Sequence, residues 1–168
     1  MSGAPGLLQG KLALVTGAGQ GNGRAIALGL AAAGARVVVT DVDAGNARQA
    51  ADDILAAGGQ ACAHALDVTD PRACEAIAAA VRQAQGPIDV LVNNAAITQK
   101  AGFREISEAD FDRVLRVNLN EVKSISLSYR GLLKKTSVDI EIYQLTVGAV
   151  QSFDPVFSKI LFFLPKLL

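Results

Sequence analysis

The sequence KLALV at residues 11–15 runs directly into TGAGQGNG at residues 16–23, and this junction decides the fold. A short apolar strand that feeds a glycine-rich turn and then a helix is typical of dinucleotide binding. Bare backbone can approach a pyrophosphate there, and the helix N-terminus directs its N–H groups and positive dipole end at the negative charge. The spacing Gly-x-x-x-Gly-x-Gly is looser than Gly-x-Gly-x-x-Gly, so the alternative is a glycine-rich turn that binds nothing.

Three glycines of this turn have distinct predicted tasks. Gly17 allows the tight turn after the strand, and Gly21 removes the Cβ that would collide with the phosphates. Gly23 lets the new helix pack close to the sheet.

A second apolar run, residues 37–39, leads to Asp41, which lies roughly 20 residues after the loop. A carboxylate at this position accepts hydrogen bonds from the adenosine ribose hydroxyls. Its charge, together with that of Asp43, repels a 2′-phosphate, and no basic residue follows the strand end to receive one. We therefore expect NAD to bind in preference to NADP.

Composition narrows the function classes. The chain has 168 residues, about one domain, and its 16 basic and 16 acidic residues balance, which gives no electrostatic reason to expect nucleic acid or a membrane surface. The first residues lack the features of a secretory signal, so we expect a cytoplasmic location.

Cys62 and Cys74 are too far apart for a Cys-x-x-Cys motif, and His64 is the single histidine. We expect reduced thiols and no metal site.

Short β-rich runs alternate with alanine-rich helical stretches from residue 7 to about residue 120. This alternation predicts an α/β fold with a doubly wound, Rossmann-like parallel sheet. We expect strands at residues 12–15, 36–40, 61–66 and 90–92, and helices at residues 22–33, 44–57 and 71–85. A fourth helix is expected to begin after Ser107, with Asp110 completing a pair similar to a capping box.

The composition changes abruptly after Asn120, since alanine then occurs only at Ala149 and lysine replaces arginine as the main basic residue. We therefore divide the chain into a dinucleotide-binding region, residues 7–120, and a divergent tail, residues 121–168, in place of a catalytic half. A frameshift, fusion or assembly error would produce such a change, and a natural domain boundary is the alternative. Residues 137–147 alternate as a half-buried strand does, and residues 156–168 are too short and interrupted to span a bilayer.

The chain combines several motifs, namely the loop at residues 16–23, Asp41, Asp67-Val68, the Asn-Asn-Ala run at residues 93–95 and Asn118. With these motifs, residues 7 to about 120 resemble the short-chain dehydrogenase/reductase family. The resemblance implies that Asp67 and Val68 contact the adenine, while Asn94 and Ala95 line the sugar near the nicotinamide. The alternative for Asp67 is that it caps the turn that follows. The full set of implied cofactor contacts is Gly17, Gln20, Gly21, Asn22, Gly23, Asp41, Asp67, Val68, Asn94 and Ala95.

Asn118 resembles the catalytic asparagine of the family, which holds a water molecule in a proton relay; the alternative is a polar residue inside a helix. The family also needs a Tyr-x-x-x-Lys pair, in which the lysine stabilises the tyrosine phenolate. Here Tyr129 is followed four residues later by Leu133, and Tyr143 by Val147. Neither tyrosine has the lysine.

We therefore interpret the chain as a truncated or chimeric oxidoreductase of short-chain dehydrogenase type that keeps NAD recognition. Hydride transfer on alcohol or ketone substrates is expected to be slow or absent. Two alternatives stay open: a noncatalytic NAD-binding module with a protein partner, and an aberrant product without function, because a lost half leaves sheet edges uncovered. The family's dimer contacts come largely from helices at and beyond Asn118, so the oligomeric state is open too.

Overall fold

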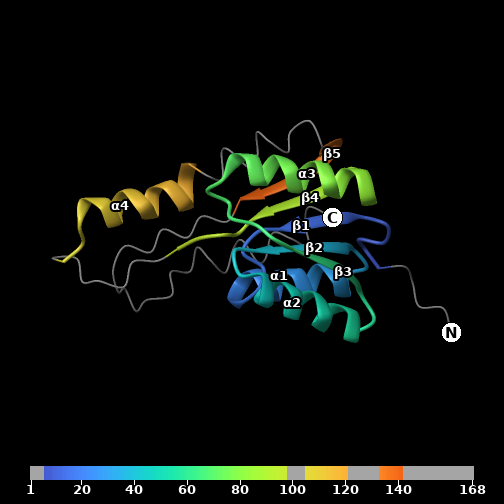
Figure 1. Ribbon diagram of the computed structural model, residues 1–168. Helices are drawn as coiled ribbons and strands as arrows, with labels where there is room; N and C mark the ends of the chain where they lie inside the picture. Colours follow the sequence, from blue (N-terminus) through green and yellow to red (C-terminus); the bar gives the residue numbers. More distant parts are fainter. Residues whose placement is uncertain (1–5, 98–104, 121–132, 142–168) are drawn as a thin grey trace.

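The computed structural model describes residues 6–97, 105–120 and 133–141, which form a parallel sheet with helices on both faces (Figure 1). The sheet order is β3-β2-β1-β4-β5, which confirms the expected doubly wound α/β fold. The strands are β1 (Leu12–Val15), β2 (Arg36–Asp41), β3 (Gln60–Ala65), β4 (Ile88–Asn93) and β5 (Leu133–Glu141). The helices are α1 (Gly21–Ala32), α2 (Ala44–Ala56), α3 (Pro71–Gln85) and α4 (Glu108–Leu115), which continues into the π-helical turn η1 (Arg116–Asn120).

The strand order reverses at β1, which lies between β2 and β4. The chain builds outward from β1 through β2 to β3, and then crosses back to add β4 on the other side of β1. Val15 pairs with Val39 on β2 and with Val92 on β4, so these three strands end close together. In open α/β sheets ligands bind outside the carboxyl ends of the strands, where the order reverses. The fold thus puts the glycine-rich turn in that position.

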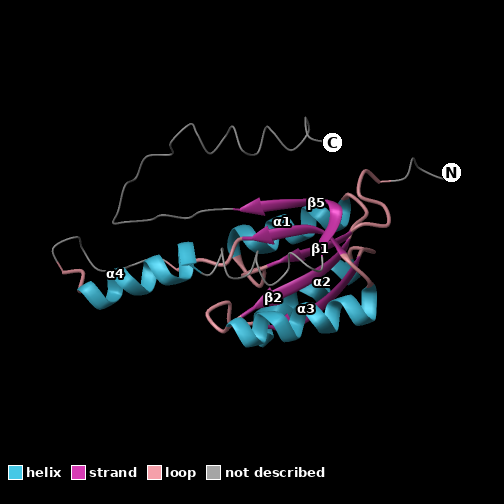
Figure 2. Cartoon of the chain, turned by 90° about the horizontal axis from the view of Figure 1, so that it is seen from above, coloured by secondary structure: helices cyan, strands magenta, loops and turns pink. Residues whose placement is uncertain are grey.

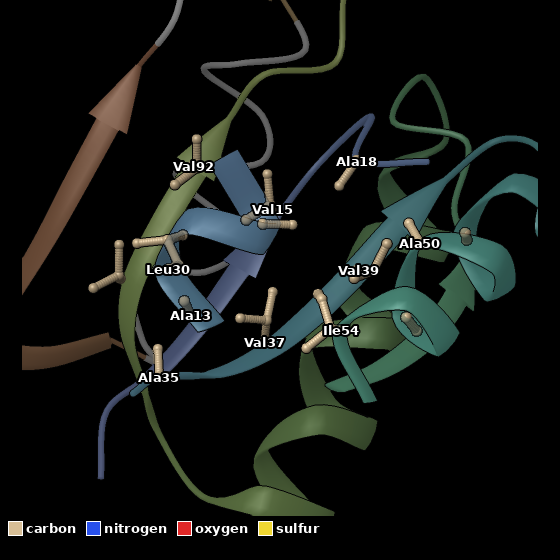
Figure 3. Packing of buried hydrophobic residues seen from close by; sticks show 14 of the residues in the cluster. Ala13, Val15, Ala18, Leu30, Ala35, Val37, Val39, Ala50, Ile54 and Val92 are labelled. Carbon is tan, nitrogen blue, oxygen red and sulfur yellow. The ribbon is translucent and has the colours of Figure 1, made fainter. Parts of the chain in front are cut away.

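Alternation along the central strands feeds two separate cores, because successive side chains point to opposite faces. One core packs the odd-numbered apolar residues of β1 and β2, such as Val15, Val37 and Val39, against α1 and α2 (Figure 3). The other packs Leu12, Leu14 and Val38 against α3. Both faces of β1 and β2 are therefore buried, which explains their nearly unbroken hydrophobic sequence.

Three helices begin at an Asp or Ser side chain that accepts a backbone N–H, and Ser107 at the start of α4 was expected from the sequence. Asp43 accepts hydrogen bonds from the second and third residues of α2, and Asp70 accepts one from Arg72 at the start of α3. Ser107 Oγ accepts the Asp110 N–H at 3.1 Å and donates to the Asp110 carboxylate. Each contact satisfies an N–H that has no partner within its helix.

β5 extends the sheet beyond β4 in parallel, with Val90 opposite Val138 and Asn93 opposite Glu141. The strand predicted from the alternation at residues 137–147 is thus confirmed up to Glu141, and the rest of that stretch lies outside the described residues. α4 lies beyond the carboxyl ends of the strands in both views (Figure 2). Among the described helices, none has the length and hydropathy needed to cross a bilayer.

Candidate functional site

The glycine-rich turn leaves β1 at Gly17 and enters α1 at Gly21. Both glycines have positive φ, +60° and +55°, a region that side chains disfavour. A Cβ on Gly17 would also lie 2.7 Å from Cα of Ala95, so the turn approaches the segment after β4 very closely. A Cβ on Gly21 would meet no protein atom within 4 Å. The backbone conformation therefore accounts for Gly21 by itself, and its role toward phosphate stays a prediction.

The N-terminus of α1 is open to solvent and carries no acidic residue. Gln20 is the N-cap residue, but its side chain makes no capping hydrogen bond, and the first turn contains no Asp or Glu. The other three described α-helices each begin at an Asp or Ser side chain that accepts a backbone N–H. Gln20, Gly21 and Asn22 are all exposed. This end of α1 thus presents N–H groups and the positive dipole end to an anion.

Gly23 is buried where α1 passes over the turn and the end of β4. A Cβ there would lie 2.9 Å from Cα of Ala18 and still closer to the Gly17 carbonyl oxygen and the Asn94 amide nitrogen. The expected close packing of the helix is confirmed, and its partners are the turn and Asn94.

Asp41 ends β2 and holds the turn in place. Its Oδ2 accepts the N–H of Gly19 at 2.9 Å, and its Oδ1 accepts the N–H of Asp43 at 3.0 Å. The residue is only 7% exposed, and each of its two carboxylate oxygens accepts one backbone N–H. A Cβ on Gly19 would collide with Asn46 at 2.6 Å and with Asp41 Oδ2 at 2.9 Å. Gly19 is therefore part of the site although the sequence analysis assigned it no role; its position two residues after Gly17 was the available signal.

Thr16 joins the turn to the segment after β4, a function that sequence reasoning missed. The buried Thr16 hydroxyl accepts the N–H groups of Asn94 and Ala95, both at 3.0 Å. In return, Asn94 Nδ2 donates to the carbonyl oxygens of Thr16 at 2.9 Å and Gly17 at 3.0 Å. Thr16, Gly17, Asn94 and Ala95 thus form one hydrogen-bonded unit between β1 and β4. The Thr-Gly step after a buried strand was the only sequence signal.

Asp67 and Val68 follow β3 at the same edge of the sheet. Asp67 Oδ1 accepts the N–H of Thr69 at 2.9 Å and its hydroxyl at 2.7 Å, which is the turn-capping role considered as the alternative. Asp67 itself is exposed, whereas the Val68 side chain is buried in the core against α3. The adenine contact implied for both residues stays a prediction.

Asn118 lies in η1, buried and directed at the segment after β4. Its Oδ1 accepts the N–H of Ile97 at 2.9 Å, and its Nδ2 donates to the Ile97 carbonyl oxygen at 3.0 Å. This double hydrogen bond explains how a polar side chain is accommodated inside a helical turn. It also links Asn118 to the segment containing Asn94 and Ala95. The catalytic role implied for Asn118 stays a prediction.

Two pKa values outside the turn depart from their usual range. The Arg24 guanidinium, which bonds Asp53 between α1 and α2, lowers the pKa of that carboxyl, and Gln49 adds to the effect. Burial raises the pKa of the Cys62 thiol above its ordinary 9.0, against the opposing effects of Gln85 and Arg36. Neither group belongs to the edge where the predicted cofactor contacts gather.

Comparisons with known proteins show which proteins this chain resembles. The sequence pattern of the short chain dehydrogenase family covers residues 11–142, and so continues past Asn120 through β5, further than the motifs alone indicated. The 3-oxoacyl-[acyl-carrier-protein] reductase FabG of Escherichia coli is 38% identical over 143 residues, 84% of this chain and 56% of that protein. The "Probable oxidoreductase EphD" of Mycobacterium tuberculosis is 45% identical over 111 residues, 66% of this chain and 19% of that protein.

A solved structure gives the same result. The crystal structure of a metagenomic short-chain oxidoreductase in complex with NADP superposes with a TM-score of 0.69 at 38% identity, and covers 74% of this chain and 57% of that one. The chain thus spans little more than half the length of FabG and of this oxidoreductase, and less of EphD. Its fold corresponds to part of theirs, and the chain belongs to the short-chain dehydrogenase family.

Proposed function

We propose that this chain binds NAD across the carboxyl ends of β1, β2 and β4. The observation that carries the proposal is the acid-free, uncapped N-terminus of α1, which lies beside the anchored carboxylate of Asp41. The first feature suits a pyrophosphate and the second suits the ribose hydroxyls, and one turn of backbone connects them. Gln20, Gly21 and Asn22 would face the phosphates, and Gly17 and Gly23 would shape the turn that presents them. Asp67, Val68, Asn94 and Ala95 would be the further cofactor contacts.

The preference for NAD over NADP is part of the proposal. Asp41 and Asp43 put two carboxylates at the end of β2, and Val42 between them is an exposed apolar residue without a donor. Two unit charges about 6 Å apart at an effective dielectric constant of about 20 repel by ~3 kcal/mol, which corresponds to roughly a hundredfold in affinity. The metagenomic relative was solved with NADP, so the cofactor is not fixed by family membership.

The chemistry of the whole family member would be hydride transfer between the nicotinamide and an alcohol or ketone, with the cofactor supplying the hydride acceptor or donor. This chain would orient the nicotinamide side through Asn94 and Ala95, and Asn118 would hold the segment that carries them. A proton must also move, and neither Tyr129 nor Tyr143 has a lysine four residues on. We infer a truncated or chimeric oxidoreductase with residues 7–120 as its cofactor region, which turns over slowly or not at all.

A noncatalytic NAD-binding module is the second candidate, and the missing Tyr-x-x-x-Lys pair is the observation that favours it. The two candidates share NAD binding and differ in turnover. Slow NADH formation with secondary alcohols, lost when NAD binding is lost, supports the oxidoreductase. Saturable NAD binding without any turnover supports the module.

Binding is tested by calorimetric titration with NAD and by the rise of the thermal midpoint that a ligand of the folded state must cause. The informative variant is Asn22→Asp, which adds a charge to α1 almost without changing shape. An acid in the first turn stabilises a helix by about 0.3–1 kcal/mol but repels a pyrophosphate. We expect the thermal midpoint of the free chain to hold or rise while NAD affinity falls at least about tenfold.

Gln83→Glu is the matched control, because it adds the same charge at an exposed position near the end of α3. It should leave NAD affinity unchanged. Equal affinity of Asn22→Asp and the original chain would refute the proposed phosphate position. The absence of any NAD binding and of cooperative unfolding would favour an aberrant product.

A further inference from the structure

Cys62 and His64 lie side by side on β3, the edge strand among those described (Figure 1). Successive side chains of a strand point to opposite faces, so residues two apart share a face. Cys62 Sγ lies 3.8 Å from His64 Nε2, and both residues are half-buried. A search for Cys-x-x-Cys spacing does not find this pair, because on a strand the two ligands of one ion are separated by a single residue.

Two further side chains reach the same place. Gln85, at the end of α3, donates its Nε2–H to Cys62 Sγ at 3.0 Å. Arg36, at the start of β2, donates to the Gln85 carbonyl oxygen at 3.1 Å, and its positive charge acts on the thiol. Within the described part of the chain, no Asp, Glu, second His or second Cys joins the pair as a possible metal ligand. The surroundings of the pair thus carry a cation and no carboxylate.

The distance between the two ligand atoms suits a single metal ion. Thiolate and imidazole are both ligands of soft metal ions. Bonds of about 2.3 Å to sulfur and about 2.0–2.1 Å to nitrogen separate these atoms by about 3.5 Å at a tetrahedral angle and by about 4.4 Å in line. The observed 3.8 Å lies within this range. We propose that Cys62 and His64 form a two-ligand site for a soft monovalent metal ion, Cu(I).

Ligand number and charge select Cu(I) over Zn(II). Zinc sites in proteins use three or four protein ligands, whereas Cu(I) forms stable complexes with two. When the ion binds, the thiol releases its proton to solvent and a sulfur–metal bond forms, with no electron transferred. The thiolate then cancels the single charge of Cu(I), and the site beside Arg36 is neutral. Zn(II) would leave a net positive charge there, which the guanidinium repels.

The site is tested on the whole chain without NAD, so the result is independent of the proposed function. Cu(I), kept reduced under anaerobic conditions, is titrated in competition with a coloured Cu(I) chelator, which gives the dissociation constant and the number of ions bound. His64 is the chain's single histidine, so its imidazole signals in the NMR spectrum are assigned without ambiguity. We expect one ion per chain and a shift of these signals that is complete at one equivalent.

Variants of the two ligands separate the site from binding by a thiol alone. Loss of a side chain that only supports a ligand weakens metal binding about 10–100-fold, so removal of a ligand should cost at least as much. We expect Cys62→Ser and His64→Leu each to weaken Cu(I) binding at least about tenfold. Cys74→Ala is the matched control, because it removes the other cysteine, which is buried on α3, and leaves the pair intact. It should change the dissociation constant by less than about twofold.

Circular dichroism checks that each variant folds, and His64→Gln replaces His64→Leu if the latter does not. Imidazole signals that stay unmoved by Cu(I), or equal Cu(I) affinity in the histidine variant and the original chain, would overturn the inference, since the thiol then binds alone. An equal loss of affinity in Cys74→Ala would overturn it as well. A shift of the imidazole signals completed by one equivalent of Zn(II) would refute the selection of a monovalent ion.

Discussion

Replacing Thr16 with valine tests whether the Thr16 hydroxyl holds the glycine-rich turn to the segment after β4. Valine has nearly the same shape, and Thr16 is fully buried, so the change removes the hydroxyl and little else. The N–H groups of Asn94 and Ala95 then lose their 3.0 Å acceptor. A buried donor left without a partner costs about 1–3 kcal/mol. Since Ala95 is only partly buried and can recover some hydration, we expect Thr16→Val to lower the free energy of unfolding by about 3 kcal/mol.

Thr40→Val is the control, because Thr40 is as deeply buried on the neighbouring strand. Its hydroxyl donates to the Val15 carbonyl oxygen at 3.2 Å, so its loss removes a donor and strands no N–H group. We expect a cost of about 1 kcal/mol.

Urea unfolding followed by circular dichroism compares the two variants. With a slope of about 2 kcal/mol per molar urea, Thr16→Val should lower the midpoint by roughly 1.5 M and Thr40→Val by roughly 0.5 M. NAD affinity should fall in Thr16→Val as well, since Gly17 is held through the same unit. A midpoint for Thr16→Val equal to or above that of Thr40→Val would show that the hydroxyl does not carry this connection.

Three further predictions concern single positions. Gly23→Ala should destabilise the chain by about 1–3 kcal/mol and weaken NAD binding, because the new Cβ collides with backbone. Gly29→Ala, on the same helix with open space around it, should stabilise the chain by about 0.5–1 kcal/mol. Thermal unfolding with and without NAD measures both effects. Asn118→Leu removes both hydrogen bonds to Ile97, so amide exchange at Ile97, followed by NMR, should accelerate; an unchanged rate would contradict the double bond. Because folding raises the pKa of the Cys62 thiol above 9.0, the folded chain holds that proton more tightly than the unfolded chain. The free energy of unfolding should therefore fall as the pH rises beyond 9. Cys62→Ser should show a weaker decline in the urea midpoint between about pH 8 and 10.

Local chemistry made most of the elements predictable. Strand β1 and helix α3 have the expected bounds, since an apolar run ended by a glycine turn and an Asp-Pro start leave few alternatives. The site edge also followed from sequence, because parallel strands end together and Asp41 closes the second strand. The bounds of the other helices and of β2, β3 and β4 differ by one or two residues, and β5 begins four residues before the expected strand. At β4 the added residues Ile88 and Asn93 pair with β5.

The contacts of Thr16 and Gly19 across the site were not predictable, because they join residues far apart in the chain. The Thr16 hydroxyl has its acceptor role only when the end of β4 lies beside β1, and Gly19 is constrained only because Asn46 on α2 packs against it. The place of β5 in the sheet was not predictable either, because the alternation at residues 137–147 predicted a strand but not that it pairs with β4.

The amino-acid sequence by itself thus determined the alternating elements, the turn at residues 16–23 and the acid at Asp41, because strand period, helix caps and glycine conformation are local properties. Only the tertiary structure decided that Asp41 anchors Gly19 and that Asn118 forms both of its hydrogen bonds to Ile97. Such contacts depend on which backbone groups are left without partners after the sheet has assembled, and these groups cannot be identified from the sequence.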